Sequence, residues 1–286
     1  MGSLPSPPRH LPVLAALALA LTACGSGDAA STVSAAELVH VHGLAENPDA
    51  DGIYVATHTG LFQVQGDDIT RVTEGYHDLM GFTVVGPGDY LASGHPDLRV
   101  DELQAPGKPP LLGLVASDDG AEWEPLSLLG ETDFHTLEAK HERVYGYDAT
   151  NGRFLISEDR TDWETMSEVA LIDFSVSPDD PELIVGSGQG GIARSEDAGT
   201  TWTPLDAPAA VFLDWSADGL FGVTADGRVA VSTDAGDTWA QLGTVEGQPE
   251  AILATPDRLL VAVADRGILE STDGGETFDV LIATDG

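Results

Sequence analysis

Cysteine and basic residues are both scarce in this chain of 286 residues. Lysine and arginine together number 12, against 48 aspartate and glutamate residues, which gives a formal net charge of −36. A surface this acidic repels nucleic acid and anionic lipid headgroups, so neither is expected as a partner. Cys24 is the only cysteine, which excludes a disulfide within the chain and a metal site built from several thiolates.

The N-terminus has the features of an export signal. An apolar run, Leu11 to Leu21, is too short to span a bilayer comfortably, and Leu21-Thr22-Ala23-Cys24 follows it. This end of the run resembles a bacterial lipobox, in which the leader is cleaved before a cysteine that then carries lipid. We therefore predict a lipoprotein signal peptide at 1–23, a lipidated Cys24 with a flexible tether at 24–37, and attachment to the outer face of the bacterial cell membrane. An ordinary signal peptide or an uncleaved anchor stays open.

A short motif recurs along the rest of the chain. Three segments match S-x-D-x-G-x-T-aromatic in full and two are one residue shorter, and their aspartates are Asp119, Asp159, Asp197, Asp234 and Asp273. A glycine and a short alternating apolar run precede each motif, and Gly60-Leu61-Phe62 is a sixth such start without the motif. The five serines that open the motifs are 37 to 40 residues apart, which is the length of one four-stranded propeller blade.

The repeat predicts an all-β fold over 38–286: a six-bladed β-propeller of four-stranded antiparallel blades. The blades are expected to end near Glu74, Thr132, Glu168, Ala207, Glu246 and the C-terminus. Whether strands from the two ends of the chain share a blade stays open. Each motif is expected in the turn between the third and fourth strands, where its aspartate accepts backbone N–H groups and has a structural role. An insertion in blade 2, Gly94 to Pro110, is expected either to cover one face as a lid or to form a mobile loop.

The repeated motif resembles that of the bacterial neuraminidase repeat, or Asp-box, superfamily. That group includes sialidases, xyloglucanase-type glycosidases, sortilin-type receptors and photosystem II assembly factors. Because enzymes and pure binders share the motif, the resemblance implies the fold and leaves the function open. The segments Val39-His40-Val41-His42-Gly43-Leu44 and Tyr54 to Phe62 resemble a narrower set of exported bacterial proteins labelled glycosylhydrolase or exo-sialidase.

Sialidase chemistry is not expected, since the resemblance implies three arginines that clasp the substrate carboxylate. No three arginines of this chain occupy matching positions on the innermost strands. A glycosidase that uses two carboxylates is harder to reject. Its candidate acids are Asp78, Asp133 and Asp173, each near the entry to an innermost strand.

Six histidines are predicted on one face of the propeller, within three consecutive blades: His40, His42, His58, His77, His95 and His135. In a propeller, the connections into the first strand and those between the second and third strands lie on the same face. When the innermost strands are aligned, Met80 and His135 take the place of His42, and Asp78 takes the place of His40. Imidazole with thioether suits copper, whereas imidazole with carboxylate suits zinc, iron or nickel.

The sequence thus predicts a surface-tethered binding protein with a His-rich pocket for a transition metal, copper or zinc, or for another small ligand. Taken singly, each histidine is also compatible with a hydrogen-bonded wall position in a polar pocket. Two other functions stay open. One is a glycosyl hydrolase-like enzyme that acts on glycans, and the other is a scaffold that binds envelope proteins.

Overall fold

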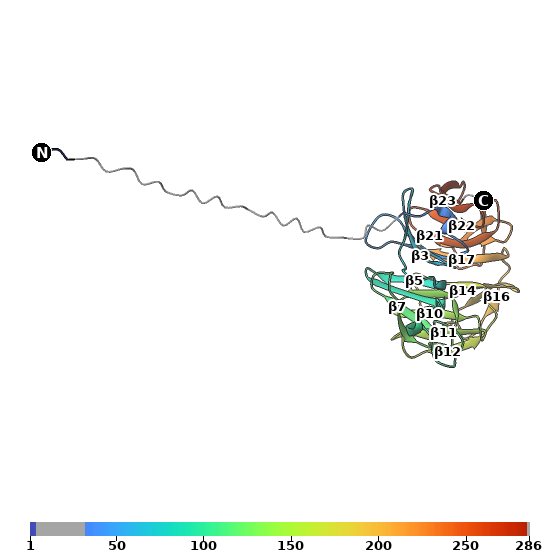
Figure 1. Ribbon diagram of the computed structural model, residues 1–286. Coiled ribbons are helices and arrows are strands. Elements are labelled where there is room, and N and C mark those ends of the chain that lie inside the picture. Colours follow the sequence, from blue (N-terminus) through green and yellow to red (C-terminus); the bar gives the residue numbers. More distant parts are fainter. Residues whose placement is uncertain (4–31, 285–286) are drawn as a thin grey trace.

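Six four-stranded antiparallel sheets follow one another around a ring in the computed structural model, which describes residues 1–3 and 32–284 (Figure 1). Each sheet uses four consecutive strands, so the prediction of a six-bladed β-propeller is confirmed, and the described strands are not shared between the first and last blades. No helix in the described ranges is long and apolar enough to cross a bilayer. Cys24 and the lipobox lie outside the described residues.

The strands run outward from the channel in chain order. Blades 1 and 2 contain β1 (Val41–Glu46), β2 (Ile53–Thr57), β3 (Gly60–Gln65), β4 (Asp68–Arg71), β5 (Asp78–Gly86), β6 (Asp89–His95), β7 (Leu114–Ser117) and β8 (Glu124–Ser127). Blades 3 and 4 contain β9 (Phe134–Lys140), β10 (Arg143–Asp148), β11 (Arg153–Ser157), β12 (Glu164–Glu168), β13 (Asp173–Val176), β14 (Ile184–Gly188), β15 (Gly191–Ser195) and β16 (Thr203–Pro204). Blades 5 and 6 contain β17 (Ala210–Ser216), β18 (Gly219–Thr224), β19 (Arg228–Ser232), β20 (Ala240–Thr244), β21 (Pro249–Ala254), β22 (Leu259–Val263), β23 (Gly267–Ser271) and β24 (Asp279–Ala283).

Packing between blades, rather than strand exchange, closes the ring. Every residue of β2 and of β22 is buried. Strands whose sheet is covered on both faces have such nearly continuous apolar sequences. Val41 and Leu44 of blade 1 share one apolar core with Ala251 and Leu260 of blade 6. The first blade therefore packs directly on the last.

The glycine before each third strand has a conformational reason. It has positive φ in all six blades, at Gly60, Gly113, Gly152, Gly191, Gly227 and Gly267. Side chains with a Cβ rarely adopt this conformation. At Gly267 an added Cβ would also lie 2.0 Å from the carbonyl oxygen of Ile282. The recurrent glycine thus permits the turn by which the chain enters the third strand.

The repeated serine–aspartate motifs lie in the turns after the third strands. In blade 4, the hydroxyl of Ser195 accepts the N–H of Gly199 at 2.8 Å, and the carboxylate of Asp197 accepts the backbone N–H and the hydroxyl of Thr201 at 2.8 and 2.7 Å. The indole N–H of Trp202 donates to the hydroxyl of Ser167 in the preceding blade at 3.1 Å. The turn therefore organises its own backbone and ties two blades together.

The insertion in blade 2 is packed on its neighbours. Leu103 and Leu112 are buried in the core between blades 1 and 2, together with Tyr54. Asp97 accepts the backbone N–H of Tyr76 at 3.1 Å and pairs with the guanidinium of Arg99. These contacts favour a fixed wall beside the ring over a mobile loop.

The described N-terminal segment adds to the outer rim of blade 1. The backbone N–H of Val33 donates to the carbonyl of Ile69 at 2.8 Å, and Thr32 forms a bridge with Thr70 of β4. An outermost strand otherwise presents unpaired backbone groups to solvent. The chain therefore enters the propeller along the edge of its first blade.

Candidate metal centre

A one-residue bulge interrupts the innermost strand at the same place in five of the six blades. The unpaired residues are His42, Met80, His135, Val211 and Glu250. A bulge re-aims a side chain and is common beside functional sites. Two residues before the bulged residue in each of blades 1 to 3, His40, Asp78 and Asp133 occupy equivalent positions. The same bulge therefore recurs around the ring. In blades 1 to 3 its residues, His42, Met80 and His135, have side chains of types that can bind metal ions.

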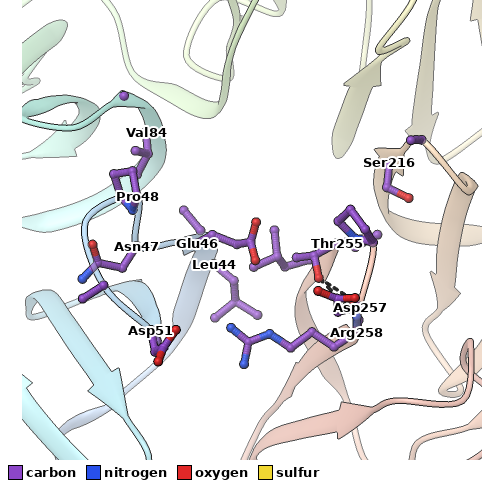
Figure 2. A pocket seen from close by; sticks show the side chains of 18 of the residues that line it. Leu44, Glu46, Asn47, Pro48, Asp51, Val84, Ser216, Thr255, Asp257 and Arg258 are labelled. Atoms are coloured by element: carbon purple, nitrogen blue, oxygen red, sulfur yellow. Dashed lines mark hydrogen bonds between the residues drawn. The ribbon is translucent and has the colours of Figure 1, made fainter.

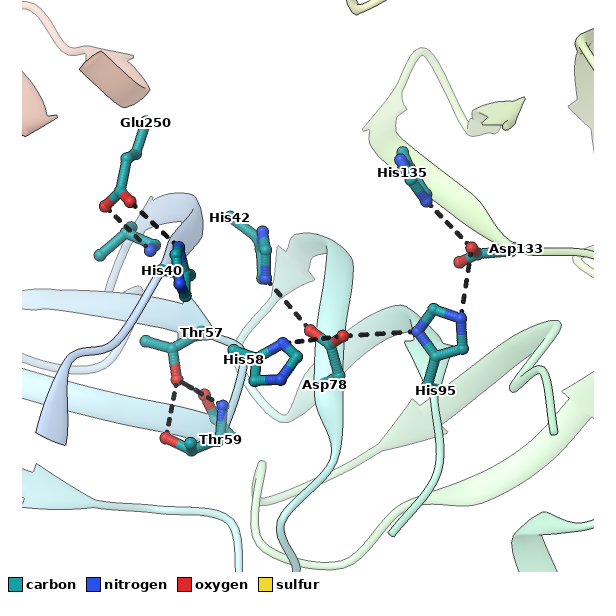
Figure 3. Close-up of polar contacts among 12 residues, drawn as sticks. His40, His42, Thr57, His58, Thr59, Asp78, His95, Asp133, His135 and Glu250 are labelled. Carbon is teal, nitrogen blue, oxygen red and sulfur yellow. Dashed lines mark hydrogen bonds and ion pairs between the residues drawn. The ribbon is translucent and has the colours of Figure 1, made fainter. Parts of the chain in front are cut away.

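Asp78, the first residue of β5, lies at the centre of the cluster (Figure 3). Its Oδ1 is 3.1 Å from Nε2 of His42, and its Oδ2 is 3.0 Å from Nδ1 of His58 and 3.4 Å from Nδ1 of His95. Burial raises the pKa of Asp78, but the three imidazoles together lower it further, so that the pKa lies below the ordinary value. The group is therefore a charged carboxylate near neutral pH.

Two ligand-type atoms face each other without a hydrogen bond. Nε2 of His42 and Oδ1 of Asp78 are both buried, and their alignment does not make a hydrogen bond although they are 3.1 Å apart. Buried polar atoms nearly always have a partner. Two ligands of a tetrahedral metal ion, bound at about 2.0–2.1 Å, lie about 3.3 Å apart. His42, His58 and Asp78 each place one donor atom within 4.8 Å of the other two, which fits three ligands around one ion.

A second carboxylate continues the cluster toward blade 3. Oδ2 of Asp133 is 2.9 Å from Nε2 of His135 and 3.6 Å from Nε2 of His95. The side chain of Asp133 is only 6% exposed, and its Oδ1 is buried without a partner. The hydrogen bond to Asp133 raises the pKa of His135 above its ordinary value. His95 thus lies between two carboxylates and presents one ring nitrogen to each (Figure 3). We call Asp78, Asp133, His42, His58, His95 and His135 the histidine cluster.

Two other predicted residues, His40 and Met80, lie at its border. His40 is exposed, and its Nδ1 is 3.6 Å from Oε1 of Glu250, while its ring centre is 6.1 Å from that of His58. Met80 is half-buried on β5. It takes no part in the polar contacts of the cluster, which join imidazoles and carboxylates.

The structure does not bring His77 into the cluster. Its side chain is buried, and its Nδ1 accepts the backbone N–H of Asp97 at 3.0 Å. Burial lowers the pKa of His77, since it disfavours the charged ring. His77 therefore fixes the insertion of blade 2 rather than facing the pocket.

Asp173, a predicted candidate acid, lies inside the channel. Its Oδ2 accepts the backbone N–H of Leu213 at 2.8 Å, and its Oδ1 accepts the hydroxyl of Thr136 at 3.2 Å. Burial raises the pKa of Asp173 to about 7. The neighbouring cavity is small, about 160 Å³. This carboxylate ties blade 4 to blade 5, which favours a structural role over a catalytic one.

The same kind of tie recurs around the channel. A carboxylate on the innermost strand of one blade accepts a backbone N–H from the innermost strand of the next. The pairs are Glu138 with Val176 at 2.7 Å, Asp214 with Ala254 at 2.6 Å and Glu250 with Val41 at 3.1 Å. Burial raises the pKa of Asp214 to about 6. Our reading of the sequence missed these residues, although Glu250 occupies in blade 6 the bulge position of His42.

The geometry is unfavourable for a two-carboxylate glycosidase. Such an enzyme needs the sugar between its two acids. Here the ring of His95 occupies the space between Asp78 and Asp133 (Figure 3). A larger hollow of about 910 Å³ lies at the opposite face, where Glu46, Asp257 and other turn residues line it (Figure 2). None of the three candidate acids lines that hollow.

Comparison with known proteins supports the fold and nothing finer. No protein-family model and no curated protein matches the chain. A solved nidogen–laminin complex is 11% identical with a TM-score of 0.63, covering 79% of this chain and 90% of that chain. YCF48 bound to a D1 peptide is 15% identical with a TM-score of 0.52, covering 85% and 82%. Virginiamycin B lyase from Staphylococcus aureus, with quinupristin, is 12% identical with a TM-score of 0.57, covering 89% and 87%.

Proposed function

We propose that the protein binds a transition-metal ion through His42, His58 and Asp78 at the histidine face of the propeller. The observation that carries this proposal is the pair of buried atoms, Nε2 of His42 and Oδ1 of Asp78, that lie 3.1 Å apart without a hydrogen bond. An ion between them satisfies both atoms. Imidazole and carboxylate ligands suit zinc, copper, nickel or iron, and copper(II) binds such sites most tightly in this series.

The surroundings favour a divalent cation. The chain carries a formal charge of −36, so a cation enters an attractive field. The lowered pKa of Asp78 keeps this ligand ionised at the pH at which neutral imidazoles coordinate metal. His95, whose Nδ1 is 3.4 Å from Oδ2 of Asp78, lies beside this set of two nitrogens and one carboxylate.

Metal titration of the chelator-treated protein tests the proposal. We expect the wild-type chain to bind zinc or copper(II) in calorimetry, and His42→Ala to weaken binding by more than about 100-fold, because even supporting residues of metal sites contribute 10–100-fold. His141→Ala is the matched control, since His141 lies in a turn at the opposite face, where its Nε2 contacts the carbonyl of Ser177. Absence of binding, or equal binding by wild type and His42→Ala, contradicts the proposal.

We further propose that the protein is exported, lipidated at Cys24, and a member of the Asp-box superfamily. The leader, the lipobox and the repeated turns support this proposal. A Cys24→Ser chain is expected in the soluble fraction, whereas the wild type is expected with the membrane and labelled by a fatty-acid analogue. Unlabelled wild-type protein contradicts the anchor. A scaffold function stays a prediction, and the similarity to YCF48 bound to a D1 peptide is one observation in its favour.

A further inference from the structure

A groove of about 690 Å³ lies between blades 3 and 4, at the face opposite the histidine cluster. The turn between β11 and β12 forms one side of it, with Asp159 and Asp162, and the turn after β15 forms the other side, with Asp197 and Ala198. Both turns carry the repeated motif. The volume is in the range of known ligand pockets. The groove is a separate candidate site, since it shares no lining residue with the histidine cluster.

Acidic residues are concentrated in this groove beyond the general excess of the chain. Six of its eleven lining residues are acidic, compared with 48 of the 286 residues of the chain. The six are Glu158, Asp159, Asp162, Glu164, Glu182 and Asp197. Backbone N–H groups that donate to Asp159 and Asp197 lower the pKa of both carboxyl groups, so these two are ionised near neutral pH. The one basic lining residue, Arg143, is 3.3 Å from Glu158 and offsets a single charge. The groove therefore has a surplus of negative charge.

The groove also has an apolar side that the cores of the two blades hold in place. Its apolar residues are Ile156, Trp163, Met166 and Ala198. The ring of Trp163 packs on that of Phe134, with 4.7 Å between the ring centres. Met166 and Ala198 pack on the buried cluster that joins blades 3 and 4, to which Ile156 belongs. A surface that is already ordered binds a ligand without an additional ordering cost.

Charge disfavours the other macromolecules that could cover this groove. A second copy of a chain with a formal charge of −36 is repelled, as are nucleic acid and anionic lipid. The chain does not supply a basic segment of its own, because no two of its 12 lysine and arginine residues are adjacent. The complementary occupant is therefore a basic segment of another protein.

We propose that this groove binds an extended segment of a partner protein in which lysine or arginine alternates with apolar residues. Long basic side chains combine an apolar stem with a charged end. The stems and the apolar residues of such a segment match Trp163 and Met166, and the charged ends match the surrounding carboxylates. The inference is independent of the proposed metal function, because the groove and the histidine cluster lie at opposite faces.

Fluorescence anisotropy with a labelled synthetic peptide of alternating lysine and leucine tests the proposal. We expect one peptide per chain at low salt, and weaker binding as the ionic strength rises. The double variant Asp162→Asn, Glu164→Gln is expected to bind about 3- to 10-fold more weakly, because two exposed carboxylates of the groove are neutralised. The matched control is Glu276→Gln, Asp279→Asn, which neutralises two exposed acids in the corresponding turn of blade 6 and leaves the groove intact.

A second comparison tests the apolar side of the groove. A peptide in which serine replaces leucine has the same charge and is expected to bind at least about 10-fold more weakly. Met166→Gln, which keeps the length of the side chain, is expected to reduce this difference. The thermal midpoint of each variant checks its folding.

The outcomes separate the groove from the general field of the chain. Equal weakening by the groove variant and by the blade 6 control overturns the proposal, and so do equal affinities for the two peptides or the absence of binding. His42→Ala is expected to bind the peptide as the wild type does, which keeps this result separate from the metal function.

Discussion

Replacing Asp173 by asparagine is expected to change how the stability of the propeller depends on pH. The pKa of Asp173 is raised from 3.8 to about 7 because its carboxylate is buried between blades 4 and 5. Below pH 3.8 the group is protonated in both the folded and the unfolded chain. Between pH 3.8 and 7 the folded chain holds a proton that the unfolded chain has lost, so the free energy of unfolding falls as the pH rises through this window.

The magnitude follows from the width of that window. Each pH unit between the two pKa values lowers the free energy of unfolding by about 1.4 kcal/mol per group. Between pH 5 and pH 8, this predicts that the wild type loses about 2–3 kcal/mol that the asparagine variant keeps. Part of the surface of Asp173 faces the channel cavity, where solvent screens the charge, so this figure is an upper value. Asparagine has the shape of the protonated acid and can still accept the N–H of Leu213.

Urea denaturation of chelator-treated protein at pH 5, 6, 7 and 8 measures the effect. The general repulsion among acidic groups is common to both chains and cancels in the difference between them. The expected result is a difference in unfolding free energy that moves steadily in favour of the variant as the pH rises. Parallel pH profiles for the two chains would refute the reasoning, and so would a difference that moves the other way.

Three further predictions concern metal, turn and blade contacts. Zinc at 100 times its dissociation constant is expected to stabilise the wild type by about 2.7 kcal/mol and His42→Ala by no more than about 0.4 kcal/mol, as measured by thermal melting with and without chelator. Gly267→Ala is expected to destabilise the fold by at least about 1–3 kcal/mol, because the new Cβ meets the carbonyl of Ile282 at positive φ; an unchanged urea midpoint contradicts this. Trp202→Phe is expected to cost about 0.5–1.5 kcal/mol for the lost indole hydrogen bond, and Trp202→Ala about 3–5 kcal/mol for the lost packing; equal urea midpoints for the two variants contradict this.

The repeat made the fold predictable from the sequence. From blade 2 onward, the glycine before each third strand recurs every 36 to 40 residues and the serine of each motif every 37 to 40 residues, and both meet the demands of turn geometry that these five blades share. The alignment of His42 with Met80 and His135 could also be predicted, because these residues occupy the same bulge in three blades.

The contacts within the cluster were harder to predict. Which nitrogen of His95 faces which carboxylate depends on side-chain directions that strand spacing does not determine. His77 has the right position in the chain, but a local contact with the backbone of Asp97 takes its ring out of the cluster. Glu250 and Asp214 were overlooked because acidic residues are so common in this chain that their placement carries little information.

The edge contact between Val33 and Ile69 limits how far the propeller can move from an anchored end. Val33 is nine residue steps beyond Cys24, and a fully extended chain spans at most about 3.3–3.6 Å per residue, or about 30 Å in all. With lipid on Cys24 as proposed, the rim of the first blade remains within that distance of the bilayer.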